Sequence, residues 1–296
     1  MILVVGATGV LGGLITRILL GQGEAVRILV RGGSSYDDLV TAGAQAVTGD
    51  LKDPDSLAAA CTGVDAVLST ANSAARGGAD TVESVDRDGN RHLVDAAAAA
   101  GVGRFVFVSA LGSDVSSPVP FMRAKAETEQ RVRDSGMTWT VLTPNLFMDV
   151  WVSAVVGGPA LSGQPVTLLG EGRRRHSMVA IREVAAYAVA ALHHRAARNQ
   201  TLVIGGPHPV SWLEVVAAFE QELGRDIRVV TVAPGEPVPG LPDMMSQLIA
   251  TLESYDSPIE MTGLSATYGV RPTSLTEFVN DFVAATGRAT GSITTG

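Results

Sequence analysis

A glycine-rich segment follows a short hydrophobic run at the very start of the chain. Residues 2–5 read Ile-Leu-Val-Val, the next seven read Gly6-Ala-Thr-Gly9-Val-Leu-Gly12, and an amphipathic stretch comes after them. In a strand–loop–helix unit the first glycine permits a tight turn, the second admits a pyrophosphate against the backbone, and the third lets helix and strand pack closely. The phosphates then lie at the positive end of the helix dipole. This order predicts a Rossmann-type dinucleotide site formed by Gly6, Thr8, Gly9, Val10, Leu11 and Gly12.

The second predicted strand, Val26–Val30, ends in Arg31 and continues through two glycines to Ser34. In dinucleotide-binding folds this position usually carries an acid that binds the ribose 2′-hydroxyl, or an arginine that accommodates a 2′-phosphate. Arg31 supplies positive charge there and Ser34 adds a hydroxyl, so NADP(H) is expected rather than NAD(H). The alternative is that Arg31 is a solvated surface residue.

The third and fourth predicted strands also end in polar residues. Asp50 and Leu51 follow the third strand, where Asp50 can lie near the adenine amine or simply cap a turn. Thr70, Ala71 and Asn72 follow the fourth strand, at the carboxyl edge where open α/β sheets bind ligands. We expect all five to contribute to the cofactor site.

Hydrophobic β-branched runs alternate with alanine-rich amphipathic stretches through the first half of the chain, which is the βαβ rhythm of a parallel sheet. The predicted fold is therefore α/β, a Rossmann-type doubly wound parallel sheet with a smaller C-terminal substrate-binding region. We expect a dinucleotide-binding domain at residues 1–148 and the C-terminal region at 149–296, with some of its elements returning to the main sheet. Strands are predicted at 2–5, 26–30, 46–48, 66–69, 104–108, 138–142, 201–204 and 227–232, and helices at 11–21, 34–42, 54–61, 82–100, 123–135, 181–196, 211–223, 243–252 and 274–285. Residues 149–176 are rich in glycine and proline and are expected to be loops, and the tail from Gly287 is expected to fray.

Composition and charge exclude several classes of protein. The net charge is −8, which argues against sequence-independent binding of nucleic acid phosphates. No apolar run is long enough to span a membrane and the start lacks the features of a signal peptide, so a cytoplasmic protein is expected. Cys61 is the single cysteine and has no activating partner nearby, so it is interpreted as structural. The histidines show no metal-ligand spacing, and no metal site is expected.

With these pieces in place, the chain resembles the NmrA-like, atypical short-chain dehydrogenase/reductase family, which includes isoflavone-reductase-like and quinone-reductase-like members. The resemblance covers almost the whole chain and implies a nicotinamide near the ends of the fourth and fifth strands. It implies that Lys125 contacts the nicotinamide ribose, that Ser109 lies beside the ring, and that Pro144, Asn145 and Leu146 contact the carboxamide or line the pocket. The motifs that carry it are Gly6–Gly12, Val26–Arg31, Gly49–Leu51, Phe105–Gly112, Lys125–Glu127 and Thr143–Met148.

One departure from the family pattern bears on chemistry. Ordinary members carry Tyr-x-x-x-Lys, but here the segment reads Phe121-Met-Arg-Ala-Lys125, and a phenyl ring has no proton to give. In an enzyme, the proton would come from water ordered by Lys125, from Ser109 or Ser113, or from a hydroxyl of the substrate. Aromatic hydroxyketones and quinones suit the last route, so we expect a reductase for an aromatic, polyketide-like ketone or a quinone. The alternative is a non-catalytic NADP(H) sensor that acts through a protein partner; an epimerase would need the tyrosine.

The remaining candidates concern the substrate. His176 follows three arginines in the predicted loop region and is a candidate catalytic group, because imidazole titrates near neutral pH. Phe121, Phe147, Met148 and Trp151 are expected at the substrate pocket, where Met148 and Trp151 can form an apolar platform or belong to the core. A monomer and a homodimer both remain open.

Overall fold

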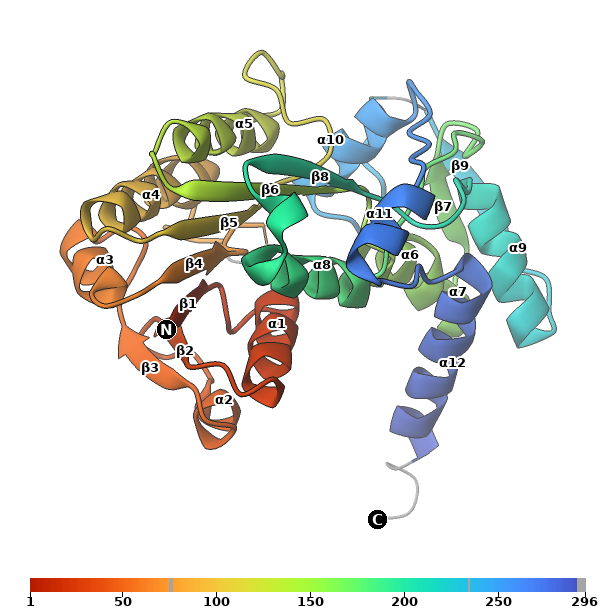
Figure 1. Cartoon of the computed structure of the whole chain (residues 1–296). Coiled ribbons are helices and arrows are strands. Elements are labelled where there is room, and N and C mark those ends of the chain that lie inside the picture. The colour runs from red at the N-terminus through yellow and green to blue at the C-terminus, as the bar shows by residue number, and fades with distance from the viewer. Residues whose placement is uncertain (75–76, 234, 292–296) are drawn as a thin grey trace. The chain divides into compact units, whose positions relative to one another are not determined.

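The computed structural model describes residues 1–74, 77–233 and 235–291, and for Met244 and residues 287–291 it describes the backbone alone. The chain divides into two compact units. The first contains Met1–Pro144, Val184–Val203 and Ala266–Val270, and the second contains Asn145–Glu183, Ile204–Ser265 and the residues from Arg271 onward. Each unit is described here by itself (Figure 1).

A seven-stranded sheet organises the first unit, in the order β3-β2-β1-β4-β5-β6-β8. The pairs β1–β2, β2–β3, β1–β4, β4–β5 and β5–β6 are all parallel. The chain builds the sheet outward from β1 in one direction and then from β4 in the other, so a crevice opens at the carboxyl ends of these two strands. The strands are β1 (Ile2–Val5), β2 (Val26–Val30), β3 (Gln45–Thr48), β4 (Ala66–Ser69), β5 (Arg104–Val108), β6 (Thr138–Pro144) and β8 (Gln200–Ile204).

Helices cover both faces of this sheet, because its strands are apolar on both sides. Leu3, Val67 and Phe105 of one face are fully buried in a cluster that also contains side chains of α3, α4 and α5, whereas α1 lies on the other face (Figure 1). The Rossmann-type doubly wound arrangement is therefore confirmed. The helical elements of this part are α1 (Val10–Gly21), α2 (Asp37–Thr41), α3 (Pro54–Cys61), η1 (Val82–Gly89), α4 (Asn90–Ala99), α5 (Pro120–Arg133), α8 (Ile181–His193), η3 (Arg195–Ala197) and α11 (Thr262–Tyr268).

The second unit pairs two short parallel strands, β7 (Val166–Leu169) and β9 (Val229–Val232), and packs helices around them. Its core contains Trp212 and Phe219 of α9, both fully buried. Helix α9 begins where Ser211 and Glu214 form a capping box and ends at Gly224 in the left-handed conformation. The helices are α6 (Met148–Val152), η2 (Ser153–Gly157), α7 (Gly158–Leu161), α9 (Trp212–Leu223), α10 (Asp243–Leu252) and α12 (Leu275–Gly291).

Residues 149–176 show the largest difference from the sequence prediction. They are not mainly loop but contain most of α6, then η2, α7 and β7. Two kinds of glycine occur in this segment. A Cβ added at Gly157 would lie 2.6 Å from the ring of Phe282, so this glycine marks close helix contact rather than a chain reversal. Gly163, Gly170 and Gly172 have positive φ and lie where the chain turns.

Smaller differences have local causes. The predicted helix 34–42 is shorter in the structure, where it is α2. The predicted helix 82–100 begins as the π-helix η1 and continues as α4. Helix α11 was not predicted, and it contains no buried residue, so it lacks an apolar periodicity that could reveal it. Helix α12 continues to Gly291 instead of ending near Ala285, and residues 292–296 of the expected tail lie outside the described residues.

Within the described ranges, no helix is both long enough and apolar enough to cross a membrane.

Candidate cofactor-binding site

The glycine loop between β1 and α1 has the geometry that the sequence predicted. Gly6 adopts a φ of +89°, which only glycine adopts without strain. A Cβ at Gly12 would lie 2.2 Å from the carbonyl oxygen of Gly6, so the third glycine is required for the close approach of helix and loop. The loop is thus held tightly against the end of β1.

The start of α1 is a helix terminus without a side-chain cap. Gly9 is its N-cap and makes no side-chain capping bond, and the first turn carries no acidic residue. The first N–H groups of a helix have no intrahelical partner and sit at its positive end. Val10, in this first turn, is 76% exposed. An anion fits this terminus because nothing in the helix itself supplies the missing negative charge.

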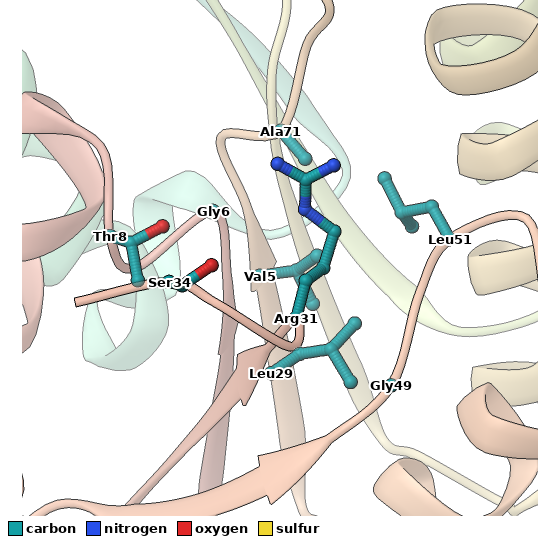
Figure 2. A pocket seen from close by; sticks show the side chains of 9 residues that line it. All are labelled: Val5, Gly6, Thr8, Leu29, Arg31, Ser34, Gly49, Leu51 and Ala71. Carbon is teal, nitrogen blue, oxygen red and sulfur yellow. The ribbon is translucent and has the colours of Figure 1, made fainter. Parts of the chain in front are cut away.

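A small pocket lies beside this terminus in the first unit (Figure 2). Six of the residues predicted for the cofactor line it, namely Gly6, Thr8, Arg31, Ser34, Leu51 and Ala71. Three lining residues were missed, Val5, Leu29 and Gly49. In the sequence, Val5 and Leu29 look like ordinary strand residues. Gly49 is a glycine directly after β3, and a Cβ there would lie 2.8 Å from the side chain of Leu29, so glycine lets the two strand ends approach.

Arg31 is the charged side chain of this pocket. One of its terminal nitrogens forms an ion pair with Asp80, and the same carboxylate accepts from Nζ of Lys52 at 2.5 Å. The hydrogen bond to Asp80 raises the pKa of Lys52, and the hydrogen bond from Lys52 lowers the pKa of Asp80. Asp80 and Lys52 were both missed, because Asp80 follows a segment without periodicity and Lys52 looks like a surface lysine.

The other predicted polar residues of this edge make local bonds. Oδ1 of Asp50 accepts from the backbone N–H of Lys52 at 2.9 Å, which is the turn-forming role weighed as an alternative. The hydroxyl of Thr70 donates to the carbonyl of Val5 at 3.3 Å and so joins β4 to β1. The amide of Asn72 donates to the carbonyl of Thr70 at 3.3 Å. These residues shape the edge of the sheet.

Lys125 lies in α5 and is almost completely buried, with 2% exposed. Its Nζ donates to the carbonyl of Val108 at 3.2 Å. The ammonium lies 4.8 Å from the ring centre of Phe107 and 5.4 Å from that of Phe121. Burial lowers the pKa of Lys125, and the nearby carboxylates Asp86 and Glu129 oppose that shift. Nζ of Lys125 is therefore held at the end of β5 by a carbonyl and lies over two aromatic faces.

Buried carboxylates accompany this lysine and were missed. Glu129, one turn after Lys125, accepts from the hydroxyl of Ser109 at 2.5 Å and from Arg133 at 2.7 Å. Asp86 of η1 accepts from the hydroxyl of Ser73 at 2.5 Å and from the backbone N–H of Ser73 at 3.0 Å. Their positions are visible in the sequence, but only the packing of α5 on η1 shows that they are buried.

His176 belongs to the second unit and is completely buried. Its Nδ1 lies 2.7 Å from the hydroxyl oxygen of Ser257, and its ring packs edge-on against Tyr255 with centroids 6.1 Å apart. Burial lowers the pKa of His176. His176 is thus enclosed by these neighbours in the interior of the second unit, and its catalytic role stays a prediction from the sequence.

The motif Thr143–Met148 runs from one unit into the other. Pro144 ends β6 and its carbonyl accepts from the N–H of Leu111 at 3.0 Å. In the second unit, the amide of Asn145 donates to the carbonyl and hydroxyl oxygens of Ser257 at 3.1 and 2.9 Å. The side chains that follow pack in the core of that unit: Leu146, Met148 and Trp151 are buried, and Phe147 is partly buried against them. With Met148 1% and Trp151 8% exposed, both side chains lie in this core, as the alternative of core residues has it.

Neither a metal site nor a reactive thiol accompanies these residues. In the described part of the chain no group of histidine, cysteine and carboxylate side chains is arranged to hold a metal ion. Cys61 is buried, and desolvation raises the pKa of its thiol to about 11. A thiol with that pKa stays protonated and unreactive near neutral pH.

Comparisons with known proteins agree with this geometry. Residues 6–195 match the model of a family described as NAD(P)H-binding. The NAD(P)H azoreductase of Xenophilus azovorans is 31% identical over 98% of this chain and 100% of its own length. The photosystem II assembly factor Ycf39 of Cyanophora paradoxa is 32% identical over 78% of this chain and 71% of its own. The NADPH-dependent quinone oxidoreductase QOR2 of Escherichia coli, solved with NADPH, has the same fold, with a TM-score of 0.80 and 22% identity over 96% of this chain and 100% of that one. The chain therefore belongs to the NAD(P)H-binding, NmrA-like group of atypical short-chain dehydrogenases/reductases.

Proposed function

We propose that this protein is an NADPH-dependent reductase of a ketone or quinone carried by an aromatic small molecule. The observation that carries the cofactor choice is the pairing of the bare N-terminus of α1 with Arg31 at one pocket. The loop Gly6–Gly12 would hold the diphosphate, and Arg31 with Ser34 would hold the 2′-phosphate. Asp50 and Leu51 would border the adenosine.

The reaction class is supported by the family and by the azoreductase and quinone oxidoreductase among its relatives. NADPH supplies a hydride when bound. A ketone gains that hydride at carbon and a proton at oxygen, and a quinone gains the same two electrons and is protonated to a hydroquinone. Each turnover therefore consumes one proton besides the hydride, and the protein must govern where it comes from.

We propose that Lys125 controls the supply of this proton. Burial among Phe107, Phe121 and the end of β5 lowers the pKa of its ammonium group. An ammonium with a lowered pKa donates a proton more readily and also stabilises negative charge on a nearby oxygen. Phe121 cannot take this part, so a substrate hydroxyl beside the reacting oxygen would assist Lys125.

A steady-state assay tests the proposal. NADPH oxidation is followed with a panel of naphthoquinones, anthraquinones and aryl hydroxyketones, for wild type and for Lys125→Met, which keeps the length of the side chain but removes its charge. We expect turnover of at least one panel member by wild type and a loss of about hundredfold in kcat in the variant, with NADPH affinity kept. Arg131→Met, which removes one cation from an exposed position on the same helix where it pairs with Asp95, serves as the matched control for loss of one positive charge. The absence of NADPH oxidation with every compound would refute the proposed activity.

A second function, a non-catalytic NADP(H)-binding protein that acts on a partner, is favoured by one observation. Phe121 replaces the family tyrosine, and the serine offered as a proton source beside Lys125, Ser109, directs its hydroxyl to Glu129. The relative from Cyanophora paradoxa carries the name of an assembly factor. Tight NADPH binding without turnover, and capture of a partner that depends on the redox state of the cofactor, would support this function over the first.

A further inference from the structure

Two cations from different parts of the sheet edge bind one carboxylate. Arg31 follows β2 and Lys52 follows β3, and they contact opposite oxygens of Asp80, Oδ2 and Oδ1. The side chain of Asp80 is 9% exposed, against 38% for Arg31 and 34% for Lys52. The carboxylate is therefore covered by the two cations at the edge of the cofactor pocket.

The backbone around Asp80 holds this carboxylate in place independently of Arg31. The N–H of Asp80 bonds the carbonyl of Gly77 at 3.3 Å, and the next residue, Thr81, caps η1 in a capping box with Ser84. A capping box orders the chain on both sides of the helix start. Asp80 is thus presented to the pocket by a defined turn, and Arg31 and Lys52 reach toward it.

The position of Arg31 has a direct consequence for ligands. Figure 2 shows its guanidinium extending from the end of β2 into the pocket, between Ala71 and Leu51. Carboxylate and phosphate oxygens accept from the same N–H donors, so the two anions compete wherever both can reach them. Asp80 occupies one terminal nitrogen of Arg31, so a 2′-phosphate that binds this guanidinium competes with the carboxylate for its N–H donors.

We propose that Asp80 is an internal competitor for the 2′-phosphate and sets how strongly the site prefers NADP(H) to NAD(H). This inference rests on the proposed function only because it assumes that the site binds a dinucleotide. Asp80 holds Arg31 and Lys52 when no phosphate is present, and the phosphate of NADP(H) displaces it. NAD(H) carries no phosphate at the 2′ position that could replace the carboxylate, so the competition acts on NADP(H).

The test is the affinity of Asp80→Asn, which keeps the size of the side chain and removes its charge. Dissociation constants are measured by titration calorimetry for NADPH, NADH, adenosine 2′,5′-bisphosphate and adenosine 5′-monophosphate. We expect NADPH and the bisphosphate to bind about threefold to tenfold more tightly, as for the loss of one or two partly exposed ion pairs, while NADH and the monophosphate change by less than about twofold. In the background of the double variant Arg31→Gln, Lys52→Met, which lacks both cations, the same substitution should have no such effect on NADPH.

Asp88→Asn is the matched control, because Asp88 of η1 pairs with Arg87 of η1 and Arg91 of α4 and does not line the pocket. If Asp80→Asn does not fold, Asp80→Ser replaces it in the same titrations. Unchanged or weaker NADPH binding in the variants, with normal binding by wild type, overturns this inference and leaves the proposed function standing. A wild type that binds neither dinucleotide overturns both.

Discussion

The hydroxyl of Ser109 donates to Oε1 of Glu129 across 2.5 Å, and Glu129 also accepts from Arg133. Since the proton of Ser109 is directed to a buried carboxylate, it is not available to a substrate oxygen in this arrangement. The bond joins the end of β5 to α5, the helix that carries Lys125. Ser109, offered by the sequence as a proton source, is better explained as a residue that positions this helix.

Ser109→Ala should therefore affect stability more than chemistry. Removal of a buried partner of Glu129 should lower the free energy of unfolding by about 1 to 3 kcal/mol, while kcat changes by less than about threefold. Urea unfolding and NADPH-oxidation assays measure the two effects. Ser135→Ala, whose hydroxyl donates to the carbonyl of Val132 at 2.7 Å in a partly buried place, is the control. A fall in kcat of about hundredfold with normal stability would restore Ser109 as a catalytic residue.

Gly12→Ala should damage the cofactor loop. The added Cβ would meet the carbonyl oxygen of Gly6 at 2.2 Å, so α1 or the loop must shift. We expect the free energy of unfolding to fall by about 3 kcal/mol and NADPH affinity to fall about tenfold. Gly21→Ala, in the last turn of the same helix with nothing within 4 Å of its added Cβ, should be neutral or stabilise by about 0.5 to 1 kcal/mol. Equal stability and affinity in the two variants would contradict the loop geometry.

Phe121→Tyr should add a proton donor beside Lys125. The ammonium lies 5.4 Å from the centre of the Phe121 ring, and a nearby cation lowers the pKa of a phenol. We expect kcat for simple aryl ketones, which lack a hydroxyl of their own, to rise at least about tenfold. The same substitution in the Lys125→Met background should give no gain. If Phe121→Tyr reduces no ketone faster than wild type does, proton transfer from this position does not limit kcat.

Glu183 should make stability depend on pH. It is 3% exposed and accepts from the N–H of Thr273 at 2.8 Å. Burial, with Asp149 nearby, raises its pKa from 4.5 to about 7, against the hydrogen bonds from Thr273 and the charge of Arg182. Because the folded pKa is above the unfolded one, the stability that protonated Glu183 contributes is complete below pH 4.5 and is lost as the pH rises through about 7.

Glu183→Gln removes this titration. Compared with wild type, the variant should gain about 3 kcal/mol of relative stability between about pH 4.5 and pH 8, since a tenfold change in proton affinity corresponds to about 1.4 kcal/mol. Urea unfolding across that range measures the difference, and comparison of the two proteins cancels the other carboxylates. Glu171→Gln, with a side chain 84% exposed, should run parallel to wild type. Parallel curves for Glu183→Gln as well would show that the pKa of Glu183 is not raised.

Most residues of the candidate cofactor pocket could be predicted from the sequence, whereas the carboxylate that binds Arg31 could not. The order of strand, glycine loop and helix is a local pattern, so the positions of Gly6, Gly12 and Arg31 followed from it. Asp80 lies 49 residues from Arg31 along the chain, and no periodicity links them. Only the folded sheet edge brings them into contact.

For the residues proposed to take part in the reaction, the sequence predicted less and the tertiary structure decided more. Lys125 came from a resemblance, but the carboxylates that surround it, Asp86 and Glu129, depend on the packing of α5 against η1. His176 and Trp151 have the chemistry of site residues and yet are buried in the second unit. Residue type states what a side chain is able to do, whereas burial decides whether it meets a ligand.

The sequence by itself determined the doubly wound sheet, the glycine loop and the arginine at the end of β2, because each depends on backbone sterics or hydrophobic periodicity within a few neighbouring residues. The tertiary structure alone decided that Asp80 binds Arg31 and Lys52, that Ser109 turns to Glu129, and that His176 lies in a core. These are contacts between residues distant in the chain, and their energies depend on distance and burial, which no local pattern records.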